Sequence, residues 1–400
     1  MGVLEKAKKL NKEYKNDNLA VIADVFPHYE RLSTGAIGLD FPLYGGIPLG
    51  RMAVFAGLEH SGKSTGACVA LAAFQRKFPD KMCVYVDVEH SLDLEFQSAM
   101  TGLDQTKLLY VNPENMGGEQ ILDYILSMQD EDDIGMIVLD SIPALVSNRD
   151  YDTEVGEDKG MSASMAKPLA KFIKKINDQL AAKKNILILI NQVREAGKTF
   201  TGANIYTEPC GHAPRFYASV KVRFGTRTFT NGDKVDLSDG ENADGFRLKF
   251  KITKNKTAST QRGGGFITFR YDTGLDWKHD LLEVALKYDF IKRPTNQSYL
   301  LVNLLTNETY KDKETGEELK FRGKQALIDY LDSHVDFQNE YLEMLNGVIS
   351  HNDNQYGSLL DARENAEIDA QERSVNSQNE KTELEYQRSL EQENKGGDDF

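Results

Sequence analysis

The chain has 400 residues, 40% of them hydrophobic, which is enough for one large domain with smaller attachments. Its cysteines, Cys68, Cys83 and Cys210, form neither a CxxC pair nor a His/Cys cluster. This pattern excludes a disulfide scaffold and a structural zinc site, and it indicates reduced thiols in a cytoplasmic protein. The formal net charge is −14, and no apolar run approaches the roughly 18 residues of a membrane span, so we expect no membrane partner.

Residues 1–32 predict an oligomerisation arm. Leu4, Ala7 and Leu10 have the spacing of a helical stripe, and the apolar run 20–26 predicts a strand. This segment has little to pack on by itself, so we expect it to dock on a neighbouring subunit.

Residues 33–276 predict an α/β core. Apolar runs separated by helical patterns are typical of a mostly parallel sheet flanked by helices. The predicted strands are 52–56, 82–87, 136–140 and 186–191, and the predicted helices are 65–78, 94–100, 118–129 and 161–182. Turns separate the later runs 219–224, 245–252 and 265–271, which predict antiparallel strands that extend the sheet.

The C-terminal third predicts a small α/β domain over 277–357 and an acidic disordered tail over 358–400. Residues 361–400 hold 12 Asp or Glu against 5 Lys or Arg, which is half of the net charge. An acidic total does not exclude nucleic-acid binding, because binding depends on local basic surfaces.

The pattern GxxxxGK[ST] follows the strand 52–56 and precedes the helix 65–78, which is the context of a phosphate-binding loop. Lys63 can reach the β- and γ-phosphates of a nucleotide, and the Ser64 hydroxyl can hold Mg²⁺. The alternative, a glycine-rich turn that binds nothing, does not explain the flanking strand and helix. The predicted nucleotide-binding residues here are Gly57, Leu58, Glu59, His60, Ser61, Gly62, Lys63, Ser64 and Thr65.

Polar residues follow the other predicted parallel strands, at the edge where α/β sheets bind ligands. Asp140 ends an apolar run in the Walker-B arrangement, which predicts a second Mg²⁺ contact. Glu89, just past the strand 82–87 and beside the phosphate loop, is the candidate that polarises the attacking water. Gln192 can bond a γ-phosphate and act as a switch. The alternatives are a helix-cap neighbour for Glu89 and a strand-end amide without a ligand for Gln192.

Two long segments follow these strands, 148–160 and 194–214. The second is rich in Gly and Thr and holds Arg194, Lys198 and Phe200. Loops with small, basic and aromatic residues suit a groove that follows a nucleic-acid backbone. The alternative is a pair of simple surface loops.

Seven motifs resemble, in order, those of the bacterial RecA family of recombinases, over about residues 3–345. They are 32–40, 45–51, 57–64, 86–93, 191–194, 215–221 and 254–256. The resemblance implies a RecA-like P-loop NTPase fold and a DNA-dependent ATPase that uses ATP and Mg²⁺. It also implies a helical filament on single-stranded DNA that pairs with homologous duplex DNA in recombinational repair and the SOS response. Single-strand-binding and loader proteins are implied partners.

The resemblance also implies roles for individual residues. Glu89 becomes the catalytic glutamate, Gln192 the γ-phosphate sensor and Asp140 the Walker-B aspartate. The implied adenine contacts are Asp93, Phe96 and Tyr271, and the implied cations acting on the neighbour's ATP are Lys254 and Lys256. Arg215 and Phe216 match interface residues, and the implied DNA contacts are Met161, Arg194, Lys198, Phe200 and Gly211.

Some positions depart from the family pattern. Phe96 stands where a Tyr is usual, which keeps stacking and loses a hydroxyl. The segment 194–214 is one residue longer than usual, and Cys210-Gly211 replaces a Gly-Gly pair. Bacterial and bacteriophage origins both fit such divergence.

Two other functions stay open at this point. A hexameric helicase shares the fold but does not require the N-terminal arm or the Asn191–Arg194 motif. A regulatory paralogue would bind nucleotide without strand exchange, which the intact Lys63, Glu89, Asp140 and Gln192 argue against. On residue grounds alone, the Lys254 and Lys256 pair is typical of a solvated strand face.

Overall fold

The computed structural model divides the chain into two compact units, Met1–Asp280 and Leu281–Phe400. The residues that it describes are 3–13, 29–152, 165–198, 204–232, 234–238, 240–258, 262–287, 290–295, 297–303, 306, 308–312 and 315–350. None of the helices in these ranges has the length and apolar content that a membrane span requires.

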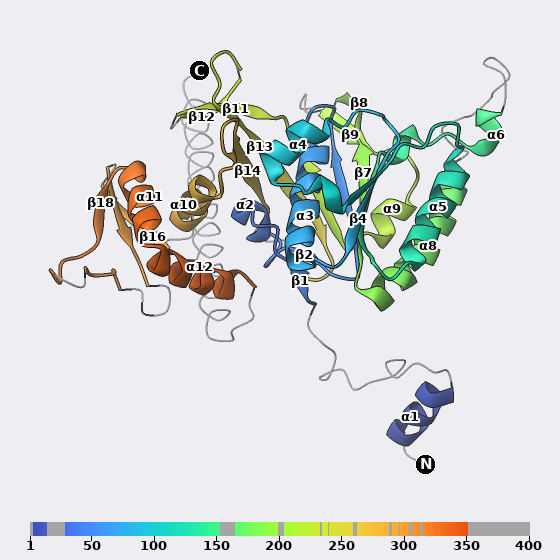
Figure 1. Ribbon diagram of the computed structural model, residues 1–400, viewed down its shortest axis with the longest axis horizontal. Coiled ribbons are helices and arrows are strands. Elements are labelled where there is room, and N and C mark those ends of the chain that lie inside the picture. Colours follow the sequence, from blue (N-terminus) through green and yellow to red (C-terminus); the bar gives the residue numbers. More distant parts are fainter. Residues whose placement is uncertain are drawn as a thin grey trace, which may run out of the picture. The chain divides into compact units, whose positions relative to one another are not determined.

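The first unit is built on an 11-stranded sheet (Figure 1). Nine of its strands follow the order β12-β11-β13-β10-β3-β7-β6-β4-β5, while β14 pairs with β13 and β15 pairs with β14. Its strands are β3 Met52–Gly57, β4 Met82–Asp87, β5 Leu108–Val111, β6 Ile134–Asp140, β7 Ile186–Gln192, β10 Val220–Phe224, β11 Thr228–Asn231, β12 Lys234–Leu237, β13 Gly245–Asn255, β14 Gly264–Arg270 and β15 Gly274–Leu275. A separate pair, β1 Arg31–Leu32 and β2 Ile47–Pro48, precedes it.

The parallel part of the sheet is buried on both faces, as its continuous apolar runs predict. Along β3, Ala53 and Phe55 join one core cluster, whereas Val54 and Ala56 join the other. The first cluster includes residues of α3 and α4, and the second includes residues of α5 and α8. The helices of this unit are α1 Val3–Glu13, α2 Ile37–Asp40, α3 Lys63–Lys77, α4 Leu94–Thr101, α5 Gly118–Asp130, α6 Asn148–Tyr151, α8 Ala166–Lys183 and α9 Ala213–Tyr217.

The sheet differs from the sequence analysis in two respects. The run 219–224 was expected to be antiparallel, but β10 is parallel to β3 and antiparallel only to β13. The segment from Gln192 to Val220 crosses from one end of β3 to the other, because Gln192 pairs with Gly57 and Val220 with Ala53. Sequence analysis also missed β5, a half-buried edge strand of four residues beside β4.

The segment 194–214 contains more regular structure than the expected loop. Strands β8 Arg194–Lys198 and β9 Asn204–Thr207 form an antiparallel hairpin, and α9 begins at Ala213. The other expected loop, 148–160, starts with α6. Residues 153–164 and 199–203 lie outside the described residues, as do the predicted strand 20–26 and the tail 358–400.

The second unit holds a three-stranded antiparallel sheet, β16-β17-β18. Its strands are β16 Ile291–Thr295, β17 Ser298–Leu301 and β18 Lys320–Arg322, and its helices are α11 Lys324–Ser333 and α12 Val335–Ser350. Helix α10, Trp277–Lys287, runs across the boundary between the units. Within the second unit, the buried Tyr341 hydroxyl donates to the Phe290 carbonyl over 2.8 Å.

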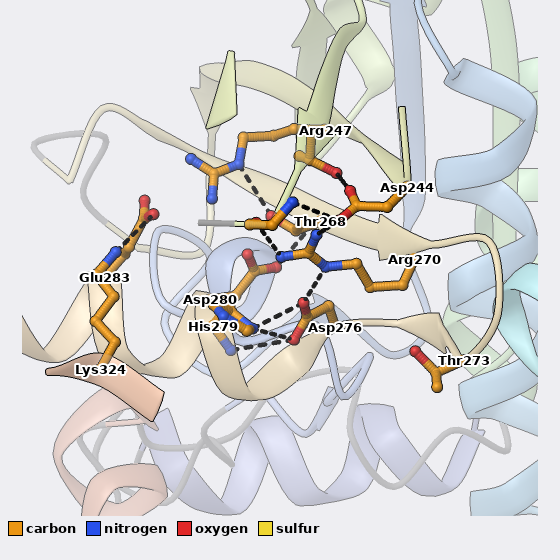
Figure 2. Close-up of polar contacts among 12 residues, drawn as sticks. Asp244, Arg247, Thr268, Arg270, Thr273, Asp276, His279, Asp280, Glu283 and Lys324 are labelled. Atoms are coloured by element: carbon orange, nitrogen blue, oxygen red, sulfur yellow. Dashed lines mark hydrogen bonds and ion pairs between the residues drawn. The ribbon is translucent and has the colours of Figure 1, made fainter. Parts of the chain in front are cut away.

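A chain of ion pairs fixes the end of β14 in the first unit. Figure 2 shows Arg270 between two carboxylates: its Nη1 lies 2.7 Å from Asp244 and its Nε 2.9 Å from Asp276. His279 Nδ1 lies 2.8 Å from Asp276. Burial acts to raise the pKa of Asp276, but hydrogen bonds from His279 and Arg270 outweigh it and lower that pKa to about 2.

A second set of polar side chains, more deeply buried, lies beside these ion pairs (Figure 2). Asp280 is fully buried and accepts a hydrogen bond from the Thr268 amide over 2.9 Å. Arg247 Nε donates to the Thr268 hydroxyl over 2.9 Å. Burial raises the pKa of Asp280 to about 7, against the lowering effect of its hydrogen bonds from Thr268. Together the two groups tie the first turn of α10 to β14.

Candidate functional site

The loop between β3 and α3 has the shape of a phosphate cradle. Gly62 adopts a left-handed conformation (φ 84°), and a Cβ added there would lie 2.3 Å from Leu248 Cδ2. A Cβ on Gly57 would lie 2.4 Å from Ser61 Oγ. Only glycine fits at either position without displacing neighbours. Among the described residues, the amides of Gly62, Lys63 and Ser64 donate no hydrogen bond to the protein, so these groups are available to an anion at the start of α3.

Lys63 and Ser64 begin α3 at the positions that the motif requires. The buried Lys63 ammonium donates to the Leu58 carbonyl over 2.7 Å, within the loop itself. Burial lowers the pKa of Lys63, and the carboxylates of Asp140 and Glu89 oppose that shift. A phosphate in the loop would offer this ammonium a stronger partner than a carbonyl.

Asp140 ends β6 and meets Ser64 across the sheet. The Ser64 hydroxyl and the Tyr85 hydroxyl donate to Asp140 Oδ2 over 2.6 and 2.5 Å. Burial raises the pKa of Asp140, against the lowering effect of these two hydrogen bonds. A hydroxyl and a carboxylate at this separation fit Mg²⁺, which takes few protein ligands and completes its shell with water and phosphate oxygens. The residues present therefore fit magnesium nucleotide.

Glu89 contacts Gln192, but, contrary to what the sequence analysis expected, the strand before it does not lie beside the phosphate loop. Strands β7 and β6 separate β3 from β4, so β4 does not lie beside the phosphate loop. The half-buried Glu89 side chain spans this gap: its Oε1 accepts from Gln192 Nε2 over 2.6 Å and also from the Ser141 hydroxyl. One carboxylate oxygen thus joins the ends of β4, β6 and β7.

The candidate adenine contacts gather around a buried ring. Asp93 caps α4 by accepting from the Phe96 amide over 3.0 Å, which fixes the start of that helix. The Phe96 ring stacks at 6.3 Å from Phe246 on β13, and the 45% exposed Tyr271 lies 5.9 Å from the same ring. Asp93, Phe96 and Tyr271 are therefore brought together around an aromatic surface.

Lys254 and Lys256 lie at the far end of β13, where α9 ends. Lys254 Nζ donates to the carbonyls of Arg215 and Phe216, and Lys256 Nζ donates to Phe216 over 2.8 Å. Cations at the last carbonyls of a helix are favourable. Burial, with Lys256 and Lys221 nearby, lowers the pKa of Lys254 to about 8.

An open cavity of about 1110 Å³ lies between Lys254 and the end of β9. Lys221 forms an ion pair with Glu208, just after β9, and the Arg223 guanidinium lies 4.5 Å from the Tyr206 ring centre. The cavity is lined mainly by basic and aromatic side chains, among them Arg215, Phe216 and Lys254. Phe216, which the resemblance predicts to lie at an interface, is 68% exposed.

The predicted DNA contacts are only partly described. Arg194 is exposed at the start of β8, and Gly211 is exposed with φ 76°. Lys198 ends β8, but its side chain is outside the described part of the structure. Met161 and Phe200 lie outside the described residues.

Sequence analysis missed two side chains at the centre of the site, Tyr85 and Ser141. Ser141 was open to prediction, because it directly follows Asp140, whereas Tyr85 was not. A buried tyrosine in an apolar run has the pattern of a core residue, so only the pairing of β4 with β6 reveals its role.

The family model for the RecA N-terminal domain matches residues 3–276. The chain belongs to the RecA family. Protein RecA of Mycoplasma genitalium is 33% identical over 269 residues, 67% of this chain and 74% of that protein. Protein RecA of Wolinella succinogenes is 29% identical over 342 residues, 84% of this chain and 89% of that protein. A solved structure, the RadB recombinase, is 18% identical with a TM-score of 0.42, and covers 60% of this chain and 97% of that one.

Membership of the RecA family confirms the resemblance found in the sequence. It also confirms the predicted α/β core and the prediction of an ATP-dependent DNA recombinase. Proteins of this family bind ATP with Mg²⁺, which agrees with the Ser64 and Asp140 geometry.

Proposed function

We propose that the chain hydrolyses ATP in response to single-stranded DNA, forms a head-to-tail filament on that strand, and exchanges it with homologous duplex DNA. The observation that carries the proposal is the shared contact of Glu89 with Gln192 and Ser141, because it links the candidate base directly to the segment that begins the hairpin. Bound Mg²⁺ would polarise the γ-phosphate for attack by water.

In this proposal Glu89 accepts a proton from the attacking water, and Lys63 and the free amides of the loop hold the phosphates. Gln192 has one side-chain N–H₂ group, now directed at Glu89 Oε1. A γ-phosphate competes for that donor. When Gln192 turns to the phosphate, the carboxylate becomes free to bind water, and the hairpin that starts two residues later is pulled with it.

The position of Lys254 supports action on the ATP of a neighbouring subunit. Lys254 pairs with Lys221, and Lys221 pairs with Val54, three residues before Gly57 on β3. Three residues span roughly 10 Å along a strand, and two strand spacings add roughly 10 Å across the sheet. A lysine side chain does not cover that distance to its own phosphate loop. The cations therefore suit a second copy's nucleotide.

The deciding measurement is the rate of ATP hydrolysis with and without single-stranded DNA. We expect strong stimulation by DNA in the wild type and a loss of about 100-fold or more in Glu89→Gln, the typical cost of removing a general base. Glu131→Gln, an exposed glutamate just past α5, is the matched control and should leave the rate unchanged.

The same preparation separates the alternatives. Strand exchange between homologous DNA molecules supports a recombinase, whereas DNA-stimulated hydrolysis with unwinding but no exchange indicates a helicase. A hydrolysis rate that is indifferent to DNA contradicts the link from Gln192 to the hairpin and favours a regulatory paralogue.

A further inference from the structure

An apolar row crosses five strands of the sheet on the face that carries the phosphate loop. Its members, which pair residue by residue from β12 to β15, are Leu237, Phe229, Phe246, Phe269 and Leu275. Paired residues of neighbouring strands point to the same face, so their side chains form one ridge. The rings of Phe246 and Phe269 stack with centres 4.9 Å apart.

This ridge runs close to the phosphate loop. Leu248 follows Phe246 by two residues on β13 and therefore shares its face. The leucine packs against Gly62, where an added Cβ would lie 2.3 Å from Leu248 Cδ2. Two strand residues span roughly 7 Å. A nucleotide with its phosphates in the loop can thus place its base over the aromatic rings around Phe246, of which Tyr271 is 45% exposed.

Arg227 lies over the Phe229 and Phe246 rings of this surface, and the fold described above gives it no structural role. It is exposed, and its guanidinium carbon lies 5.3 Å from the centre of the Phe246 ring and 5.5 Å from that of Phe229. It precedes Thr228, which pairs with Arg247, so continuation of the ladder places it opposite Leu248. Within the described ranges, no carboxylate pairs with this guanidinium.

We propose that Arg227 is a nucleotide-specificity residue that donates hydrogen bonds to acceptor atoms of a purine base while it stacks on Phe229 and Phe246. A guanidinium is planar, permanently charged and a donor only. Purines present the ring acceptor N7 on the edge away from the pairing face, and guanine adds O6 beside it, whereas pyrimidines have no atom in the position of N7. The two phenylalanine rings already restrict the arginine side chain, which reduces the entropy lost on binding. The inference rests on the proposed function in one respect, that the loop binds a nucleoside triphosphate.

The test compares three magnesium-loaded ligands, ATP, CTP and inorganic tripolyphosphate, by calorimetric titration of the full chain. Arg227→Leu keeps an apolar side chain on the rings and removes the donors. We expect it to weaken ATP binding about tenfold, to change CTP binding much less, and to leave tripolyphosphate binding unchanged. The value of kcat at saturating ATP should stay the same, because Arg227 contacts the base equally in the bound substrate and in the transition state.

The matched control is Arg293→Leu in the second unit, where an exposed arginine lies 5.6 Å from the Tyr299 ring centre. It removes the same kind of stacked guanidinium and should leave all three affinities unchanged. Arg227→Lys, which keeps the charge without the planar fork, should show an intermediate loss for ATP.

Equal losses for ATP and tripolyphosphate in Arg227→Leu would overturn the proposal, because the effect would then lie in the loop or the fold. An unchanged affinity for ATP would overturn it as well. If the wild type binds neither ATP nor tripolyphosphate, the proposed function itself fails. This result differs from the two outcomes above, which concern only the Arg227→Leu variant.

Discussion

A hydrogen bond joins the Glu89 carboxylate to the Gln192 amide, and in our proposal this bond holds the site inactive until nucleotide binds. Glu89 Oε1 receives donors from both Gln192 and Ser141, so the oxygen best placed to accept a proton is already in use. A γ-phosphate that draws Gln192 away removes one of these donors and leaves the oxygen open to the attacking water. In our proposal, nucleotide sensing and activation of the base are therefore one event.

Lys254 offers a pH test of the proposed action on a neighbour's ATP. Its pKa is lowered to about 8 by burial and by Lys256 and Lys221, so the free protein loses this positive charge as the pH rises through that value. An uncharged amine cannot neutralise phosphate oxygens. We expect kcat/KM of the DNA-stimulated ATPase, which reports the free protein, to fall between pH 7.5 and 9 in the wild type, and to fall less in Lys254→Arg, since arginine stays charged.

Lys251→Arg, an exposed lysine on the same strand, serves as the control for this profile. It should follow the wild type. Identical profiles for wild type and Lys254→Arg would remove Lys254 from the reaction.

Among single residues, prediction from the sequence works where a motif ties chemistry to spacing. Lys63, Ser64 and Asp140 meet because a phosphate loop and the end of an apolar strand have fixed places in a parallel sheet. Tyr85 and Arg227 could not be assigned in this way. Their roles depend on which strands are neighbours, and strand order is set by packing between residues far apart in the chain.

The junction of β14 with α10 depends on a carboxylate whose ionisation opposes folding. Asp280 is fully buried, faces Thr268 and Arg247, and has a pKa raised to about 7 by burial. Between pH about 4 and 7 the folded state keeps a proton that the unfolded state has released. Its contribution to stability therefore falls as the pH rises through this window, at up to about 1.4 kcal/mol per pH unit.

Asp280→Asn should remove that slope. Urea unfolding between pH 4 and 8 measures it: wild type should lose stability relative to the variant up to about pH 7, and the difference should then stay constant. Asp276→Asn, measured by urea unfolding between pH 2 and 4, is the control of opposite sign. The pKa of Asp276 is lowered to about 2, so its stabilising effect is present above pH 4 and is lost as the pH falls through the folded pKa. A constant difference between wild type and Asp280→Asn at every pH would contradict the assignment.

The strands were predicted best where they are buried on both faces. Continuous apolar runs mark β3, β4, β6 and β7. The hairpin β8–β9 was missed because Arg194–Lys198 and Asn204–Thr207 have no alternation of apolar and polar residues in the sequence. The parallel direction of β10 was missed for another reason: a run of apolar residues does not record which way the chain runs relative to its neighbour.

Assembly can be tested by mixing two inactive subunits. One carries Lys254→Ala and Lys256→Ala and keeps Glu89; the other carries Glu89→Gln and keeps both lysines. If the lysines serve a neighbour, random mixing in equal amounts restores about a quarter of the interfaces, because a head-to-tail interface takes one half-site from each subunit. The DNA-stimulated ATPase of the mixture is the measurement.

Each variant alone is the control and should stay inactive at all concentrations. Absence of recovery at every mixing ratio would contradict the trans role of the lysines. It would leave the phosphate loop and Glu89 as a site complete within one subunit.

The separation of Lys254 from Gly57 along the sheet has a consequence for length. If each subunit completes its neighbour's site and not its own, an open row of subunits always contains one site fewer than it has members. A pair runs at half its nominal capacity and a long row approaches full capacity. The rate of ATP turnover per subunit therefore rises with the number of subunits in the row. The first and last subunits differ from the others, and from each other, in whether a neighbour completes their site, although their sequences are the same.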